Sequence, residues 1–363
     1  MDKDIEIVGF DGGNANVKVD GRQTVAFPHA LLPMTDSEVS TLTGEDANAA
    51  GVEHAWRVER KRGRHWQDMG WFMIGQRAMR NGKGSVKFGA ARYTDTYFGV
   101  LAAIGLFQCD TPNGSDVLLG GSHTPDHRIY KQDMINAAMG QWRVTNPGME
   151  NGIRQFHVRQ VFCLDEPVAA YRHATISDAN AGQFHGEEWL RSGVVIVLDI
   201  GGLTTGVSVV EQRRVDYSAG ASDDIGMLDV LDELAKGIRK RYVRQLTNTP
   251  FLDMHKVRNA LRVGKFDAGG YGMLDVKQEA ERARGIVLNR IPALYTRFGG
   301  KENYNGVLLA GGGSADMATQ LRELIDHPNI AFADPSMDQL HFSTARGSRK
   351  VLRTLYKAGK IKI

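Results

Sequence analysis

Residues 194–205, which read VVIVLDIGGLTT, decide the fold class of this chain. The apolar, β-branched run over residues 194–198 predicts a short and fully buried β-strand. Asp199 follows that run, and the pair Gly201-Gly202 predicts a tight turn. Such a turn presents successive backbone N–H groups in a concave arrangement that suits phosphate oxygens. Residues 207–210 predict a returning strand, so the stretch is expected to be a hairpin with a phosphate-binding turn.

The same pattern occurs at the N-terminus of the chain. Residues 5–10 and 17–19 each predict a strand, and a polar, glycine-containing turn separates them. A gap-free alignment of the two stretches pairs Asp11 with Asp199, Gly13 with Gly201, and Asn16 with Thr204. A repeat in two halves of a chain predicts two related lobes that face each other. Two such hairpins, one from each lobe, suit the binding of one polyphosphate between them.

The rest of the chain alternates strand and helix patterns. Further strands are expected over residues 117–119, 158–164 and 307–310, and the last of these runs into Gly311-Gly312-Gly313-Ser314. Helices are expected over residues 97–107, 167–173, 228–242 and 315–325, and the last thirty residues are expected to be helical and basic. This alternation predicts an α/β protein.

Composition excludes several classes of protein. The 363 residues are 42% hydrophobic and 24% charged, which is typical of a folded globular chain and not of a disordered one. With only Cys109 and Cys163 the chain is not a disulfide scaffold, and a reducing compartment is the default. No signal peptide is recognisable, and no apolar run is long enough to span a bilayer. We therefore expect a cytoplasmic protein without a membrane partner.

The net charge of +3 is not a nucleic-acid signature, and no direct nucleic-acid binding is expected. One basic stretch, residues 57–64, lies between Trp56 and Trp66. It has two interpretations, a contact with a phosphate backbone or a solvated rim of a hairpin. A run this short favours the second.

Five motifs in this order resemble the actin-like ATPase superfamily, and they span nearly the whole chain. Residues 11–18 resemble its first phosphate loop, 199–205 its second, 164–171 (LDEPVAAY) its first connecting segment, 307–313 (VLLAGGG) its adenosine motif, and 345–347 its second connecting helix. Within the superfamily the chain is most similar to the ParM-type plasmid-segregation filament proteins. Residues 73–78 (MIGQRA) and 222–227 (SDDIGM) carry that likeness.

The resemblance implies an α/β, two-lobed actin-like fold of duplicated ribonuclease-H-like domains with a nucleotide cleft between the lobes. The first lobe would cover residues 1–165, with a C-terminal helix at about 340–363 returning to it, and the second would cover residues 166–340. The implied function is a polymerising protein that hydrolyses ATP to drive filament dynamics, in plasmid or DNA segregation of a prokaryote. ATP, ADP and Mg²⁺ would be its cofactors. Its partners would be further copies of itself and a DNA-binding adaptor protein.

The resemblance also implies roles for individual residues. Asp11 and Asp199 would hold Mg²⁺ through water, because Mg²⁺ keeps several waters in proteins. Lys18 would place its charge against the phosphates, and Glu166 would orient the attacking water. The residues expected to contact the nucleotide are Gly12, Gly13, Asn14, Asn16, Lys18, Gly201, Gly202, Leu203, Thr204, Gly311, Gly312, Gly313 and Ser314.

Each of these roles has a structural alternative. The two aspartates are also suited to capping turns, and Lys18 is also explained as a solvent-facing strand residue. A glutamate in the first turn of a helix is stabilised there by the helix dipole whether or not it is catalytic.

Three rival functions belong to the same superfamily. A small-molecule, sugar-type kinase or a phosphohydrolase is the main alternative, and Glu166-Pro167 favours attack by water over attack by a sugar hydroxyl. A chaperone ATPase would carry a substrate domain after the adenosine motif, for which the chain leaves little room. A membrane-linked filament protein would need an amphipathic anchor. The basic run 346–363 suits a docked terminal helix better.

Overall fold

The computed structural model of the protein describes residues 5–13, 15–45, 55–74, 78, 95–149, 152–178, 183–247, 252–296 and 301–361. The chain divides into two compact units, which we call unit 1 (residues 1–187 and 341–363) and unit 2 (residues 188–340). Unit 1 thus extends past the boundary expected after residue 165, because the helix that begins there packs within unit 1. Within the described ranges, no helix is long and apolar enough to cross a membrane.

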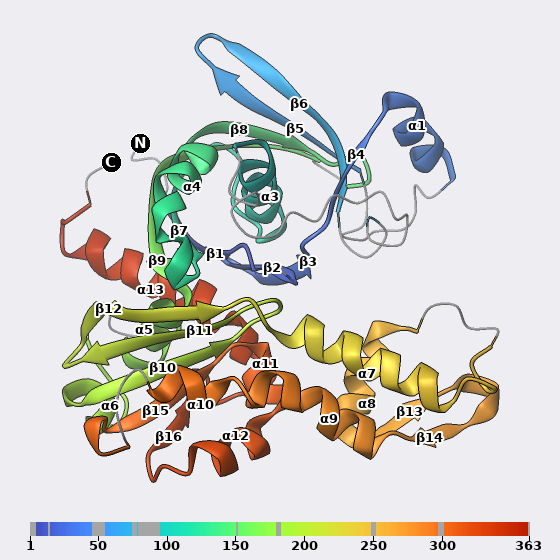
Figure 1. Ribbon diagram of the computed structural model, residues 1–363. Coiled ribbons are helices and arrows are strands. Elements are labelled where there is room, and N and C mark those ends of the chain that lie inside the picture. Colours follow the sequence, from blue (N-terminus) through green and yellow to red (C-terminus); the bar gives the residue numbers. More distant parts are fainter. Residues whose placement is uncertain are drawn as a thin grey trace. The chain divides into compact units, whose positions relative to one another are not determined.

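Unit 1 is built on one large mixed sheet, whose described part has nine strands (Figure 1). In spatial order these are β3 (Thr24–Pro28), β2 (Asn16–Asp20), β1 (Ile5–Asp11), β7 (Ser115–His123), β9 (Ile153–Asp165), β8 (Gly140–Thr145), β5 (Ala55–Arg62), β6 (His65–Ile74) and β4 (Leu31–Met34). Strands β1, β7 and β9 run parallel, and β1 pairs antiparallel with β2. The carboxyl ends of these three parallel strands therefore meet at one edge of the sheet.

Helices cover both faces of this parallel core. They are α3 (Asp95–Gln108), η2 (Pro125–Tyr130), α4 (Lys131–Ala138), α5 (Glu166–Thr175) and α13 (Ser343–Lys357), whereas α1 (Asp36–Glu45) follows the edge strand β4. Successive side chains of β7 point to opposite faces of the sheet. Val117 and Leu119 belong to the core that contains α3, whereas Leu118 packs with Leu352 of α13. Burial on both faces explains why the central strands read as continuous apolar runs.

Helix α13 lies unusually close to its neighbours in unit 1. A Cβ atom on Gly347 would lie 1.7 Å from the carbonyl oxygen of Ala169 in α5, and one on Gly9 of β1 would lie 1.8 Å from the carbonyl oxygen of Ala345. Lys350 is buried, and its Nζ donates to the carbonyl oxygen of His173 at 3.0 Å. These contacts hold α5 and α13 together on the sheet.

Unit 2 has a smaller sheet, with the described strands in the order β12 (Arg214–Asp223), β11 (Thr205–Glu211), β10 (Val194–Ile200), β15 (Gly306–Ala310) and β16 (Ile330–Phe332). A separate ribbon joins β13 (Lys265–Asp267) and β14 (Met273–Asp275). The helices are α6 (Glu188–Ser192), α7 (Met227–Arg241), α8 (Met254–Val263), η3 (Gly269–Tyr271), α9 (Lys277–Leu288), α10 (Ile291–Thr296), η4 (Lys301–Asn303), α11 (Gly312–Asp316) and α12 (Ala318–Ile325), and η5 (Leu340–Phe342) leads into α13. The described helices α7, α8 and α9 share one apolar core with β10 and β15.

The structure confirms most of the expected elements and corrects two. The first is the C-terminal helix, which covers Ser343–Lys357 and not all of the last thirty residues. The helices expected over residues 97–107, 167–173 and 228–242 are α3, α5 and α7. The single helix expected over residues 315–325 is wrong, because Met317 interrupts it with φ of −123° and separates α11 from α12. Met317 is fully buried, and α11 is held against β10, so the chain changes direction there.

The close approach of α13 to α5 predicts the effect of a single methyl group. Alanine normally stabilises a helix interior relative to glycine by about 1 kcal/mol. In Gly347→Ala the added Cβ would overlap the carbonyl oxygen of Ala169, so we expect a net loss of about 1–3 kcal/mol in the free energy of unfolding, measured with urea.

Gly285→Ala is the matched control for that substitution. Gly285 lies inside α9, and the nearest atom to an added Cβ is Nδ2 of Asn289 at 3.5 Å, an ordinary contact. This variant should be as stable as the natural protein or more stable. A Gly347→Ala protein that matched it would show that α13 does not pack on α5 as closely as described.

Candidate active site

The first predicted hairpin places Asp11, Lys18 and Ser122 in direct contact. Asp11 and Lys18 are paired across β1 and β2. Nζ of Lys18 donates to Oδ2 of Asp11 at 2.6 Å, and the hydroxyl of Ser122 at the end of β7 donates to Oδ1 at 3.3 Å. Asp11 is only 3% exposed. Lys18 is therefore not a solvent-facing strand residue, and the two charges form a partly buried pair at the end of β1.

His29, which lies outside the turn after Asp11, forms a hydrogen bond to that turn. Nδ1 of His29 donates to the carbonyl oxygen of Gly13 at 2.6 Å, and the His29 ring stacks on Tyr97 at 5.2 Å between centroids. A Cβ on Gly13 would lie 2.8 Å from Nζ of Lys18. Glycine at this position leaves the lysine ammonium accessible from the turn. Asn14, predicted to contact the nucleotide, lies outside the described residues.

Two adjacent carboxylates follow at the end of β9, and they differ in their surroundings. Asp165 is buried; Nη2 of Arg128 donates to its Oδ2 at 2.5 Å, and Nδ1 of His123 lies 3.4 Å from its Oδ1. Burial lowers the pKa of His123, against the opposing effects of a hydrogen bond to Thr124 and of the Asp165 charge. Asp165 is thus bound within unit 1, as expected for a structural residue.

Glu166 begins α5 and is half-buried. Pro167 follows it, which suits the first helical turn because proline lacks an N–H group. The helix N-terminus stabilises the negative charge of Glu166. The end of β9 therefore provides two carboxylates. That of Asp165 is paired with Arg128, and that of Glu166 is partly exposed at the start of α5.

The second hairpin has the register of the first. Asp199 pairs with Gly206 across β10 and β11, seven residues on, just as Asp11 pairs with Lys18. Each hairpin also has a parallel neighbour on its other side, β15 for β10 and β7 for β1. The gap-free alignment of the two stretches is therefore also an alignment of their structures.

The second turn directs its carbonyl groups toward a helix. The N–H of Met227 donates to the carbonyl oxygen of Gly201 at 3.0 Å, and that of Leu228 to Gly202 at 2.7 Å. Both donors belong to the first turn of α7. Within the described part of the chain, the N–H groups of Gly202 and Leu203 donate no hydrogen bond. The turn therefore keeps donors available for an anion.

The glycine run after β15 packs against the second hairpin. Gly311 has φ of +78°, and a Cβ there would lie 2.2 Å from Oδ1 of Asp199. A Cβ on Gly313 would lie 2.4 Å from Cγ2 of Ile200. Ser314 is fully buried, and its hydroxyl donates to the carbonyl oxygen of Ala310 at 2.5 Å. Protein packing alone thus accounts for the two glycines and for the serine hydroxyl, and their predicted contact with adenosine stays a prediction.

A pair of arginines fixes the helix that follows this run. Asp316, at the end of α11, has a side chain with no exposed surface. Nε of Arg258 donates to its Oδ2 at 2.9 Å, and Nε of Arg262 donates to its Oδ1 at 2.6 Å. Both arginines are on α8. The carboxylate therefore ties α11, and with it the glycine run, to α8.

The structure brings the predicted residues together within each unit. Unit 1 gathers Asp11, Gly13, Lys18 and Glu166 at one sheet edge, and unit 2 gathers Asp199, the turn 201–204 and the glycine run 311–313. Sequence reasoning missed Ser122, His29 and Asp316. Only the strand-end position of Ser122 was a usable signal, because the other two act through partners far away in sequence. No cluster of three or more potential metal ligands occurs among the described residues.

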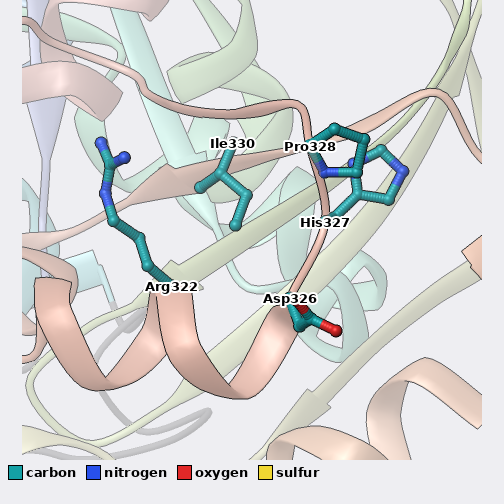
Figure 2. A pocket seen from close by; sticks show the side chains of 5 residues that line it. All are labelled: Arg322, Asp326, His327, Pro328 and Ile330. Carbon is teal, nitrogen blue, oxygen red and sulfur yellow. The ribbon is translucent and has the colours of Figure 1, made fainter.

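One pocket, of about 420 Å³, lies away from all of these residues. Figure 2 shows its lining side chains, which come from the end of α12 and the segment leading into β16: Arg322, Asp326, His327, Pro328 and Ile330. The guanidinium of Arg322 lies over the Phe332 ring at 5.2 Å, and Nδ1 of His327 accepts from the N–H of Asn329 at 3.0 Å. These contacts shape the chain reversal before the edge strand.

No protein-family model matches the sequence, and no curated protein matches it. Solved structures do match it in fold. An archaeal actin homolog aligns with a TM-score of 0.72 at 19% identity, covering 96% of this chain and 99% of that one. ParM of Bacillus thuringiensis with ATP aligns with a TM-score of 0.71 at 14% identity, covering 98% and 100%. A subunit of a 15-stranded ParM filament from Clostridium botulinum aligns with a TM-score of 0.69 at 16% identity, covering 97% and 99%.

These likenesses over nearly the whole of each chain show that the protein has the two-lobed actin-like fold. The α/β, actin-like fold expected from the sequence motifs is confirmed.

The arginine pair on Asp316 predicts a strongly non-additive effect. Arg258→Ala or Arg262→Ala alone leaves one guanidinium on the carboxylate, and each should cost about 1–1.5 kcal/mol in the free energy of unfolding. The double variant leaves a buried charge without a cation and should cost about 3–5 kcal/mol. A double-mutant cycle from urea denaturation measures the excess. Additive losses would mean that the arginines act independently of Asp316.

Proposed function

We propose that this protein is a nucleotide-driven, polymerising ATPase. The observation that carries the proposal is the repeated hairpin, in which an aspartate is the last or second-last residue of a buried strand and a glycine-containing turn of equal length follows in both units. The actin-like fold supports it, since the neighbours in fold include an archaeal actin homolog solved as a complex with ADP and a ParM solved with ATP.

The phosphates of ATP would be bound by the two turns. The N–H groups of Gly202 and Leu203, whose turn is fixed by α7, would donate to phosphate oxygens without further rearrangement. Lys18 would share its ammonium between Asp11 and a phosphate, because an ammonium has three donors and Asp11 uses one of them. A side chain larger than hydrogen at Gly13 would occupy the space beside that ammonium.

Asp11 and Asp199 fit an Mg²⁺ site in their chemistry and position. Both carboxylates are nearly buried, and each stands at a strand end directly before a phosphate turn. When bound, Mg²⁺ would neutralise charge on the phosphate oxygens and help to orient them. Each carboxylate would act from its own unit by accepting hydrogen bonds from the ion's water shell.

Glu166 would orient the water that attacks the γ-phosphorus. Phosphoryl transfer depends on positioning and charge stabilisation more than on covalent assistance by the protein. Glu166 is half-buried at the N-terminus of α5, whereas the neighbouring Asp165 is buried and contacts Arg128 and His123. Attack by water rather than by a substrate hydroxyl would make the protein an ATPase and not a kinase.

The same proposal extends to assembly and cellular role. One neighbour in fold is a subunit of a ParM filament, which supports self-association of this chain. We propose that the protein forms a cytoplasmic filament that moves plasmid or other DNA in a prokaryote. A DNA-binding adaptor protein would connect the filament to the DNA. Both cysteines are free and buried, which agrees with a reducing compartment.

Light scattering with sedimentation tests the proposal directly. With Mg²⁺ and ATP we expect scattering to rise and then decay as phosphate is released, and with ADP we expect no lasting polymer. Phosphate release with no scattering change, and no sedimenting material at any protein concentration, would favour a soluble kinase or hydrolase. A screen of small-molecule acceptors would follow.

The proposed role of Glu166 predicts a separation of binding from hydrolysis. Glu166→Ala should bind ATP as the natural protein does, because the side chain would contact water and not the nucleotide. Its rate of phosphate release should fall roughly a hundredfold or more. Fluorescent-nucleotide titration and a phosphate-release assay measure the two quantities. Hydrolysis at the natural rate would exclude the water-positioning role.

A further inference from the structure

The hairpin of β5 and β6 ends in an exposed basic tip, which we call the basic tip and define as Lys61, Arg62, Gly63, Arg64 and His65. All five residues are exposed. Gly63 has φ of +59°, which a tight hairpin turn requires, and nothing lies within 4 Å of a Cβ placed there. The tip therefore combines three permanent positive charges with an open, unobstructed turn.

The basic tip belongs to a free two-stranded ribbon. Strand β8 pairs with β5 only over Arg57–Arg60, and β4 pairs with β6 only over Trp71–Ile74. Residues 61–66 pair only with each other within the described part of the sheet. Figure 1 shows the hairpin extending beyond the other strands of its sheet.

The remaining charges of the hairpin are used within unit 1. Arg57 donates to Asp68 at 2.8 Å, Arg60 donates to two carbonyl oxygens of the α4 region, and Arg143 of β8 pairs with Glu59. Both acidic residues of the ribbon are thus neutralised by other cations. Lys61 and Arg64 form no ion pair with any described residue. The charges of Lys61 and Arg64 are therefore not cancelled by any residue that the structure describes.

We propose that the basic tip binds the phosphate backbone of double-stranded DNA. A two-stranded β-ribbon has the width that the major groove of B-form DNA admits, whereas the deep, narrow groove of double-stranded RNA does not admit it. Lysine and arginine at the end of such a ribbon reach the phosphates on either side. The whole-chain charge of +3 led us to expect no direct nucleic-acid binding, but the exposed charge of the basic tip favours a direct, non-specific contact in addition to the adaptor proposed above.

The absence of apolar surface argues against the other anionic partners. None of the exposed large hydrophobic side chains of the described residues belongs to this hairpin. Trp66 is half-buried, and the guanidinium of Arg143 lies 4.7 Å from its ring centroid. A protein interface needs an apolar core, and stable attachment to a membrane needs apolar insertion or a lipid anchor. Charge alone is enough for non-specific binding to DNA.

Fluorescence anisotropy with a labelled DNA duplex of mixed sequence tests the proposal. The full chain is titrated without nucleotide at several salt concentrations, so the result does not depend on the proposed ATPase. Contacts of Lys61 and Arg64 with two phosphates predict that log K falls against log salt with a slope of about −2. In a filament the tips would repeat, and binding would become multivalent.

The double variant Lys61→Glu/Arg64→Glu should bind at least about tenfold more weakly at low salt, and its salt slope should be smaller by about 2. Lys61→Gln/Arg64→Gln gives a second test if the charge reversal disturbs folding. The matched control is Lys357→Glu/Lys360→Glu, which makes the same charge change at exposed positions of the C-terminal segment. The control should keep most of the affinity.

Three outcomes would overturn the proposal. The first is no salt-dependent binding of DNA by the natural protein. The second is an equal loss of affinity in the tip variant and the control, which would reflect net charge alone. The third is tip-dependent binding to phosphatidylserine vesicles without binding to DNA, which would assign the basic tip to a membrane surface.

Discussion

The structure depends on how a buried central strand ends. A strand covered on both faces has to leave the sheet through a turn whose backbone groups find partners, because an unpaired buried polar group is costly. In unit 2 the carbonyl groups of that turn are satisfied by the first N–H groups of α7, and two of its own N–H groups are left available. The hydrogen bonds made by the carbonyl groups of the turn thus also fix the direction of its N–H groups. The result is a turn with two N–H groups available to an acceptor, which is the arrangement that our proposed function assigns to a phosphate.

Charge is distributed by the same strand ends. Asp11 and Lys18 are neighbours only because β1 and β2 pair with this register, and Ser122 joins them only because β7 lies parallel to β1. At the end of β9, two consecutive carboxylates have different surroundings. Asp165 is buried and contacts Arg128 and His123, whereas Glu166 is the first residue of α5 and is half-buried. Adjacent acidic residues therefore acquire separate roles from the packing around them.

The packing beneath the sites is as specific as the sites themselves. The approach of α13 to α5 leaves no space for a side chain at residue 347, and the carboxylate of Asp316 holds α11 to α8 through two guanidinium groups. These contacts lie behind the turns and not in them. In unit 1 they hold α13 against α5, and in unit 2 they hold α11, which contains Gly312 and Gly313, to α8. The basic tip is different, because it is attached to the sheet only through its own base.

Local pattern in the sequence determined much of this protein. Apolar runs ended by Asp-x-Gly located both hairpins and their equal length, and helical periodicity located α3 and α7, because strand and helix periods are properties of short segments. Pro167 located the start of α5, because proline suits the first helical turn. Tertiary structure decided the rest. The Asp316 clamp, the His29 contact to Gly13 and the membership of α5 in unit 1 each join segments far apart in the chain. Which residues meet across such distances depends on strand order and helix packing, and no local pattern records these.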